Sequence, residues 1–292
     1  MTFDSLIIGE TAQDTNVDYD GSTVRAVGGA VYYSGFAAAN LGHRIAVLPK
    51  ADTSVIDLKA AFAPAPNITV YPIHSATSFV TKNVYHTPDR ERRTSTVDSV
   101  IEPYRVEEIP PVDAKIWHFA GLVAGDIPNE MIAYAAQQGV MVALDVQTML
   151  RHEEGGGMVF HDWAEKKTYL PMIRFLKTDA LEAEILTGLT DRAEAAKLLY
   201  SWGAKEIMIT HNTEVLIYDG KEIYTCPIKA RNLSGRTGRG DTTFAGYITE
   251  RQRADIPEAL QYCTALVSLK METPGPFQGT RQDVLDYIKE FY

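Results

Sequence analysis

The chain has 292 residues, of which 45% are hydrophobic and 23% charged, and its 38 acidic and 28 basic residues give a net charge of -10. At roughly 100–200 residues per domain, this length fits one large domain or two modest ones, with a core that needs no disulfides or metals. The acidic balance argues against a general nucleic-acid binder, because a phosphate backbone requires a basic face. A small anionic ligand is not excluded, since it needs only a local positive pocket.

Cysteine usage and the apolar runs indicate a soluble chain of a reducing compartment. Cys226 and Cys263 are the two cysteines and have no CxxC or metal-like spacing, so a disulfide framework is not expected. The start of the chain carries Asp4 before its apolar run and lacks the basic residues of a signal peptide. No apolar run approaches the roughly 18–20 residues of a membrane span. We expect a cytoplasmic protein with no membrane partner and no nucleic-acid partner.

In chain order, short apolar runs alternate with amphipathic stretches. The runs predicted as strands lie at residues 6–9, 44–48, 116–119, 140–144, 173–176, 206–210 and 215–218. The stretches predicted as helices lie at residues 30–41, 129–138, 179–186, 192–200, 241–251 and 257–270. A strand followed by a helix, repeated along the chain, is typical of a mostly parallel sheet covered on both faces.

Two segments interrupt this alternation, at about residues 11–27 and 69–97. Both are polar and β-prone and have little helical character. We predict that they form a small β-sheet inserted into a single α/β domain over residues 1–292. Beside a binding crevice such a sheet can act as a lid, and the alternative is a surface hairpin. The three glycines at 155–157 predict a flexible loop.

Several motifs of well-known chemistry are absent. The chain has no GxxxxGK[ST] loop, no GxGxxG after the first strand, no HExxH and no GxSxG. An unrelated α/β dinucleotide-binding enzyme is therefore not expected. His152, Glu153 and Glu154 look like metal ligands, but adjacent residues in a loop more often form a solvated turn, so we expect no metal there.

A glycine-rich run before a predicted helix carries the most chemical information. It reads Thr237-Gly238-Arg239-Gly240-Asp241, and a helical pattern follows directly. The glycines allow a tight turn that exposes successive N–H groups, which form an anion site together with the positive end of the helix. A carboxylate in the first helical turn is held ionised by the helix dipole. The alternative is an aspartate that only caps the helix.

This run resembles the C-terminal signature of the ribokinase-like (PfkB) carbohydrate kinases, usually written D-T-x-G-A-G-D. The resemblance implies a three-layer α/β/α sandwich with a mostly parallel central sheet and a small inserted β-sheet lid. It also implies transfer of the γ-phosphate of ATP to a hydroxyl of a sugar or polyol. By resemblance, Asp241 is the base that activates this hydroxyl, and the amides of Gly238, Arg239 and Gly240 form the anion hole.

Further matches to the family follow in the expected order from residue 6 to residue 276. Gly28 and Gly29 resemble its N-terminal Gly-Gly signature, and 177–188 resembles its N-x-x-E segment, which serves the Mg–phosphate region. The candidate substrate-binding residues are Asp14, Gly28, Gly29, Tyr33, Phe79, Asn83 and Arg151. The implied nucleotide-binding residues are Lys177, Asp179, Thr210, Thr237, Gly238, Gly240, Pro274 and Gly275. Mg2+ is expected to be held through water by Asp179 and Glu182, and a monovalent cation near the nucleotide loop stays open.

The chain departs from the family pattern at four positions. Arg236 replaces the leading aspartate of the signature, and Arg239 replaces its alanine. The Arg239 guanidinium either reaches phosphate oxygens or points into solvent while only its amide is used. Asp179 replaces the asparagine of N-x-x-E, and a carboxylate there can still order Mg-bound water. Tyr33 replaces a common asparagine, which implies a different acceptor, such as one that stacks on an aromatic face.

The acceptor is predicted to be unphosphorylated. Arg90, Arg92 and Arg93 either reach inward from the inserted sheet or lie in a solvated loop, and the mixed charges there favour the loop. We favour a sugar or polyol, although Tyr33 and Phe79 leave a nucleoside open. The alternatives are a nucleoside kinase of the same family and an inactive nucleotide- or sugar-binding regulator. Family resemblance also suggests a homodimer through the inserted sheet, unless charges blunt its edge.

Overall fold

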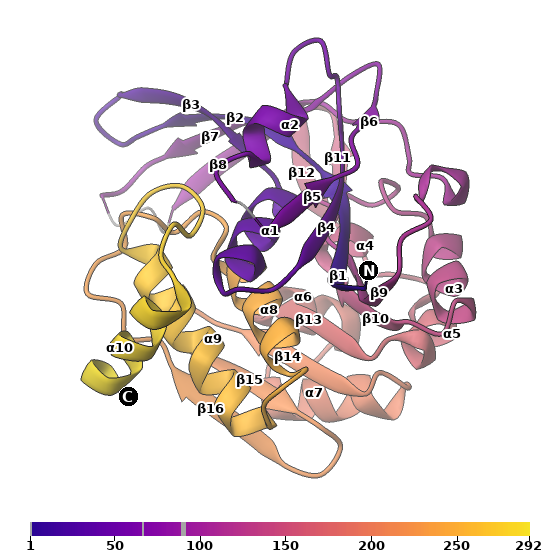
Figure 1. The fold of residues 1–292 in the computed structure, drawn as a ribbon, viewed down its shortest axis with the longest axis vertical. Helices are drawn as coiled ribbons and strands as arrows, with labels where there is room; N and C mark the ends of the chain where they lie inside the picture. Colours follow the sequence, from indigo (N-terminus) through magenta and orange to yellow (C-terminus); the bar gives the residue numbers. More distant parts are fainter. Residues whose placement is uncertain (1, 66, 89–91) are drawn as a thin grey trace.

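A large, mostly parallel sheet forms the centre of the fold (Figure 1). The computed structural model describes residues 2–65, 67–88 and 92–292. The strands of this sheet are β1 (Phe3–Glu10), β4 (Ile45–Ala51), β5 (Ile68–Val70), β6 (Ile73–His74), β9 (Ala114–Phe119), β10 (Met141–Asp145), β13 (Phe175–Asp179), β14 (Glu206–Thr210), β15 (Glu214–Tyr218) and β16 (Ile223–Pro227). Their order is β16-β15-β14-β13-β10-β9-β1-β4-β5, with β6 paired to β4. The pairs from β14 to β5 are parallel, and β15 and β16 add an antiparallel edge.

Helices cover both faces of this sheet. The helices of one face are α1 (Ala30–Asn40), α8 (Arg239–Glu250), α9 (Ile256–Met271) and α10 (Arg281–Phe291). The helices of the other face are α3 (Asn129–Gln137), α6 (Ala180–Thr187) and α7 (Arg192–Ser201). Side chains of β1 alternate between the two layers, as a strand requires: Ile7 packs with the first set, and Leu6 and Ile8 pack with the second. The buried runs of these strands therefore face helices on both sides.

A second, smaller sheet lies at the upper left of the view in Figure 1, where its strands β2, β3, β7 and β8 are labelled. Its strands are β2 (Ala12–Val17), β3 (Thr23–Gly28), β7 (Phe79–Tyr85), β8 (Arg93–Ser99), β11 (Arg151–Glu154) and β12 (Gly157–Phe160). They follow the order β11-β12-β8-β7-β2-β3. One residue, Thr11, separates β1 from β2, so the chain passes directly from the large sheet into the small one. This short link fixes the small sheet beside one end of β1.

Short helical segments complete the connections. They are α2 (Leu58–Phe62), α4 (Gln147–Leu150), α5 (Lys166–Tyr169) and the 3-10 turns at Val106–Glu108 and Leu170–Met172. Local capping explains where several longer helices begin. Asp179 accepts from the amide of Glu182 while the Glu182 side chain accepts from that of Asp179, which is a capping box at the start of α6.

The predicted three-layer α/β class is confirmed, and each strand and helix predicted from the apolar pattern is present with small shifts of its ends. The hairpin of β11 and β12 was missed as part of the second sheet. Its turn contains Gly155 and Gly156 at positive φ, where a flexible loop was expected. β16 and α10 were also missed. The pattern of 281–291 is amphipathic, with Thr280 and Asp283 forming a capping box, so α10 carried a readable signal.

Two absences concern the described part of the chain. None of its helices is long and apolar enough to cross a membrane. Its histidine, cysteine and acidic side chains form no cluster of three or more with the geometry to hold a metal ion. His152, Glu153 and Glu154 lie in β11 rather than in a solvated turn.

Candidate active site

A cleft of about 540 Å³ opens between the two sheets. One wall comes from the small sheet, with Asp14, Thr81 and Asn83 among its side chains. The other comes from the carboxyl ends of β13 and β14 and from the start of α8, where Asp241 lies. The carboxyl ends of parallel strands are where ligands bind in open α/β sheets. The location of the cleft therefore follows from the topology.

The turn that leads into α8 forms the floor of the cleft. Gly238 has φ +78° and caps the helix, a conformation that favours glycine. A Cβ added to Gly238 would lie 2.2 Å from the Tyr33 ring, so a side chain here is excluded by contact as well as by backbone. Ser34 of α1 donates to the carbonyl of Asp241 at 3.3 Å. Helix α1 thus packs directly on the turn and fixes its position.

The amides at the head of α8 are partly engaged within the turn. The first N–H groups of a helix have no partner inside the helix. Here the amide of Arg239 donates to the carbonyl of Arg236 at 3.2 Å, and that of Thr242 donates to the carbonyl of Gly238 at 3.0 Å. In this structure the Arg239 amide is therefore engaged within the turn, and its place in an anion hole stays a prediction. The amide of Gly240 lies between these two and borders the cleft.

A buried ionic network lies under this turn. The Lys177 ammonium is 3.0 Å from the carboxylate of Asp145 and 3.7 Å from that of Glu182. Arg151 reaches the other oxygen of Glu182 at 3.3 Å. The Lys177 Nζ would also lie 3.3 Å from a Cβ added to Gly240, so its charge sits against the glycine turn. Lys177 and Arg151 are the two cations of this network, and the positive charge of each acts on the carboxylate of Asp241.

Burial and charge shift the pKa values of Asp241, Asp145, Glu182 and Lys177. Burial raises the pKa of Asp241, and the charges of Lys177 and Arg151 oppose the rise. Burial also raises the pKa of Asp145 and of Glu182, again against Lys177. For Lys177, burial lowers the pKa but the surrounding carboxylates outweigh it and raise it overall. Lys177 thus remains an ammonium, while Asp241 is a carboxylate of increased basicity, which suits a general base.

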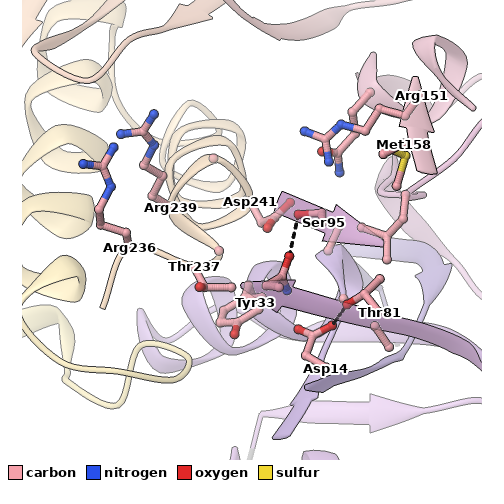
Figure 2. Close-up of a pocket in the computed structure, with 18 of the residues that line it drawn as sticks. Asp14, Tyr33, Thr81, Ser95, Arg151, Met158, Arg236, Thr237, Arg239 and Asp241 are labelled. Atoms are coloured by element: carbon pink, nitrogen blue, oxygen red, sulfur yellow. Dashed lines mark hydrogen bonds between the residues drawn. The ribbon is translucent and has the colours of Figure 1, made fainter. Parts of the chain in front are cut away.

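In the described residues, the wall from the small sheet consists mainly of neutral hydrogen-bonding groups near the carboxylate of Asp14. Thr81 donates to Asp14 at 2.7 Å across the β2–β7 pair, and burial raises the pKa of Asp14 (Figure 2). Ser95 donates to the side-chain oxygen of Asn83 at 2.7 Å across the β7–β8 pair. Arg93 also borders the cleft, and its charge opposes the rise at Asp14. This wall offers donors and acceptors suited to hydroxyl groups.

The cleft brings together most of the predicted site residues. Those that line it are Asp14, Gly29, Tyr33, Phe79, Asn83, Arg151, Lys177, Asp179, Thr210, Thr237, Gly238, Arg239, Gly240 and Asp241. Tyr33 lines the cleft but is only 6% exposed and packs on Gly238, and the stacking of its ring on an acceptor stays a prediction. Arg90 lies outside the described residues, and the favoured reading of Arg93 as part of a solvated loop is wrong, since it reaches the cleft.

Four predicted residues do not line the cleft. Gly28 instead backs Asp14, since a Cβ there would lie 2.2 Å from the Asp14 carboxylate. Glu182 is fully buried beneath the wall in the ionic network. Pro274 and Gly275 follow α9 outside the cleft, in the segment that packs against Gly235 through the Thr273 carbonyl.

Of the two residues expected to hold Mg2+ through water, Asp179 is better placed than Glu182. Glu182 is committed to Lys177, Arg151 and the amide of Asp179. One carboxylate oxygen of Asp179 accepts a hydrogen bond from the Glu182 amide, and Asp179 also borders the cleft. Such a donor suits Mg2+, which keeps several waters and is often held by one carboxylate plus phosphate oxygens. The set therefore fits an ion held through water by Asp179, with Glu182 orienting that carboxylate.

Several residues of the site were not predicted from the sequence. Asp145 ends β10, and a carboxylate at the end of a buried strand was the signal for it. Thr81 and Ser95 could not be predicted because strand pairing places them opposite Asp14 and Asn83. Lys270 was overlooked as well. It follows Cys263 and Leu266 at helical spacing, which puts it on the buried face of α9.

Figure 2 shows how the charged groups are distributed around Asp241. The guanidinium groups of Arg236 and Arg239 extend from the turn on one side of Asp241, and Arg151 lies on the other. Burial lowers the pKa of His211, which follows β14, and the charges of Arg192 and Arg239 lower it further. The cationic side of the cleft thus extends from Arg151 past Asp241 to the end of β14.

Comparison with known proteins gives consistent matches over nearly the whole chain. A sulfate-complex structure of a pyrophosphate-dependent kinase in the ribokinase family is 30% identical, with a TM-score of 0.88 and coverage of 96% of this chain and 99% of that one. A pyrophosphate-dependent myo-inositol-1 kinase, converted into a myo-inositol-3 kinase by replacing an asparagine and a serine with leucine, is 27% identical, with a TM-score of 0.86 and 98% of each chain covered. A cytidine kinase of Thermococcus kodakarensis is 25% identical over 279 residues, 90% of this chain and 92% of that protein. No family model matches the chain.

The layered fold, the glycine turn and the half-buried carboxylate at the head of α8 match a kinase of the α/β class. At 30% identity over almost the full length of both proteins, the chain belongs to the ribokinase family.

Proposed function

We propose that the chain transfers a phosphoryl group to a hydroxyl of a neutral polyol or sugar. The observation that carries this proposal is the position of Asp241. Its half-buried carboxylate lies at the head of α8, beside the Gly238 turn, at the point where the cationic wall meets the wall of hydroxyl-binding groups. Asp241 takes the proton of the acceptor hydroxyl as its oxygen attacks the phosphorus.

Each wall has a separate task in this proposal. Phosphoryl transfer depends chiefly on alignment and on neutralisation of charge. Lys177 and Arg151 supply fixed positive charge beside the base, and the Gly240 amide with the head of α8 faces the transferring group. Mg2+ bound with the donor would neutralise further phosphate charge, with Asp179 as its water-mediated protein partner.

The acceptor wall supports a polyol over a nucleoside. Tyr33 is 6% and Phe79 1% exposed, so neither offers a free ring face for a base. Asn83 and Ser95 are hydrogen-bonded to each other and both border the cleft. In the related myo-inositol kinase, replacing an asparagine and a serine changes which hydroxyl is phosphorylated. We propose that Asn83 and Ser95 orient a cyclitol-like acceptor in this chain.

The donor has two candidates. ATP is the donor implied by the sequence resemblance. Inorganic pyrophosphate is favoured by Arg236 and Arg239, which both border the cleft beyond Asp241, and by the donor of the 30% identical relative. Pyrophosphate can be bound only through its phosphate oxygens. An arginine guanidinium binds such oxygens with two parallel hydrogen bonds. An adenosine moiety would need an apolar surface as well.

The test is a matrix of donors and acceptors. The wild-type chain is incubated with Mg2+, with ATP or pyrophosphate, and with inositols, pentoses, hexoses and nucleosides, and phosphorylated products are detected by 31P NMR. Asp241→Asn run in parallel provides the blank. We expect a polyol product with at least one donor. A nucleoside product alone would replace the acceptor assignment, and absence of any product would favour a binding protein.

A further inference from the structure

Lys270 is a buried lysine at the end of α9 whose ammonium is held by the backbone of the glycine turn. Its side chain is 2% exposed, and its Nζ donates to the carbonyl oxygens of Gly235 and Thr237. These carbonyls belong to the segment that leads directly into Gly238. The Nζ also lies 5.2 Å from the centre of the Tyr33 ring, which itself packs on Gly238.

The segment around Gly235 is fixed to the end of the same helix. The Gly235 amide donates to the carbonyl of Met271 at 2.7 Å. A Cβ added to Gly235 would lie 1.9 Å from the Thr273 carbonyl oxygen, so backbone packs on backbone there. The carbonyls of Gly235 and Thr237 therefore converge on one point, and the ammonium of Lys270 at the end of α9 occupies it. Convergent main-chain carbonyls are ligands that suit a cation.

We infer that the Lys270 ammonium is a built-in cation that holds the Gly235–Thr237 segment in the shape required for phosphoryl transfer, so that the chain needs no free monovalent cation there. The inference rests on the proposed function for its activity readout. It answers the question that the sequence left open, because the two carbonyls that face this point already have an ammonium as partner. Lys270 is a positioning residue, since it acts on the substrate groups through the turn.

The charged and titratable groups near Lys270 come from two other helices. Asp241 of α8 favours the ammonium, and the hydroxyl of Tyr33 on α1 has a pKa raised by burial. Burial lowers the pKa of Lys270 to about 8, while Asp241 opposes that change. Because the folded value lies below the unfolded value of about 10.4, loss of this proton does not by itself lower the free energy of unfolding. Alkaline pH should therefore reduce turnover without an equal loss of stability.

The first experiment compares wild type with Lys270→Met in tetramethylammonium buffer, with and without added KCl or NH4Cl. We expect wild-type turnover to be unchanged by either salt. Lys270→Met should lose turnover by a factor on the order of 10², because a misplaced turn costs about that much. Added K+ or ammonium should restore part of it. Lys270→Gln, which keeps a polar amide, serves if the methionine variant fails to fold.

A matched control is available in Lys50. It is also 2% exposed, donates to the carbonyl of Pro103 at 3.0 Å and lies 5.1 Å from the Tyr104 ring, but it does not border the cleft. Lys50→Met removes a buried lysine with the same kinds of contact and also breaks its ion pair with Glu108. We expect lower stability and no response of turnover to K+ or ammonium.

The second readout needs no activity. Binding of K+ to the folded state raises Tm with concentration. We expect KCl, relative to tetramethylammonium chloride, to raise the Tm of the Lys270 variant and not that of wild type or Lys50→Met. This result with no turnover in any chain would sink the proposed function and leave the inference standing. K+-dependent turnover of wild type, or no cation response of a folded Lys270 variant in either readout, would overturn the inference.

Discussion

The two walls of the cleft differ in what holds them and in what they offer. The wall at the carboxyl ends of β13 and β14 carries paired buried charges. The ammonium of Lys177 lies within 4 Å of the carboxylates of both Asp145 and Glu182. The wall from the small sheet carries mainly hydroxyl and amide groups held by cross-strand hydrogen bonds, and Asp14 and Arg93 are charged residues of its described part. Paired buried charges thus predominate where a phosphate would bind, and hydroxyl and amide groups predominate where a hydroxylated acceptor would bind.

This difference has an energetic meaning. A buried charge is expensive unless it is paired, so the charged wall permits few substitutions and has little freedom to change. A neutral hydrogen bond contributes only about 0.5–1.5 kcal/mol, so the acceptor wall can change its pattern at small cost. We infer that the reaction is set by the charged wall and the choice of acceptor by the small sheet. The following predictions test this division, beginning with the largest effect.

Asp241→Asn removes the base where the two walls meet. The amide keeps the size of the side chain but cannot take the proton, so kcat should fall by a factor on the order of 10²–10⁴. Calorimetric titration should show that both substrates still bind, and Tm should change little, because Gly238 rather than Asp241 caps the helix. A variant that keeps nearly full turnover, or that loses stability and not rate, would make Asp241 a structural residue.

Gly238→Ala tests the contact between the turn and α1. The new Cβ would meet the Tyr33 ring at 2.2 Å, and the φ of +78° disfavours it as well. Displacement of the turn should lower turnover by a factor on the order of 10².

Gly42→Ala is the matched control for this substitution. Gly42 has φ +87° and open space around its Cβ position, so it shares the backbone strain without the clash. Gly42→Ala should lose about 1–2 kcal/mol of stability by denaturant unfolding, and Gly238→Ala should lose more because of its clash with Tyr33. Only Gly238→Ala should lose turnover, and an equal loss in both would refute the role of the contact.

Asp14→Asn tests the buried carboxylate of the acceptor wall. Hydrogen bonds to a charged group contribute about 1.5–3 kcal/mol, so kcat/KM for the polyol should fall about 10-fold to 100-fold. KM for the donor should be unchanged. Asp20→Asn, on the exposed turn of the same hairpin, should behave as wild type in steady-state kinetics. An equal rise of both KM values in Asp14→Asn would show that the walls do not act separately.

The double substitution Asn83→Leu and Ser95→Leu should have the smallest effect on rate. It replaces both members of one cross-strand hydrogen bond by apolar groups and also removes the hydrogen bond that the Asn83 amide donates to Asn16, so a modest loss of stability should accompany it. We expect turnover within about tenfold of wild type, but a different hydroxyl phosphorylated, as assigned by two-dimensional NMR of the product. The same product with unchanged KM would exclude the pair from acceptor recognition.

The sequence predicted the parts of this site whose residues are neighbours in the chain. Gly238, Gly240 and Asp241 are adjacent, and glycines before a helix have a direct physical meaning. The alternation of apolar runs likewise predicted the layered fold, because buried parallel strands and covering helices have distinct patterns.

The parts that the sequence left out depend on packing between distant segments. Lys270 meets Thr237 only because α9 returns its end to the turn 33 residues earlier in the chain. Asn83 meets Ser95 through a register that shifts between Val80 and Thr81. Tyr33 was read as a ring for the acceptor, and its contact with Gly238 requires the packing of α1 on α8. None of these relations is encoded in local spacing.

The pH dependence of kcat/KM for the polyol tests the central claim most directly. Burial raises the pKa of Asp241 above its ordinary value, and the base works only when ionised. Wild-type kcat/KM should therefore fall with unit slope as the pH drops through a value above about 4, while the residual activity of Asp241→Asn lacks this limb. A wild-type profile that stays flat down to pH 4, or an identical acid limb in Asp241→Asn, would contradict the account.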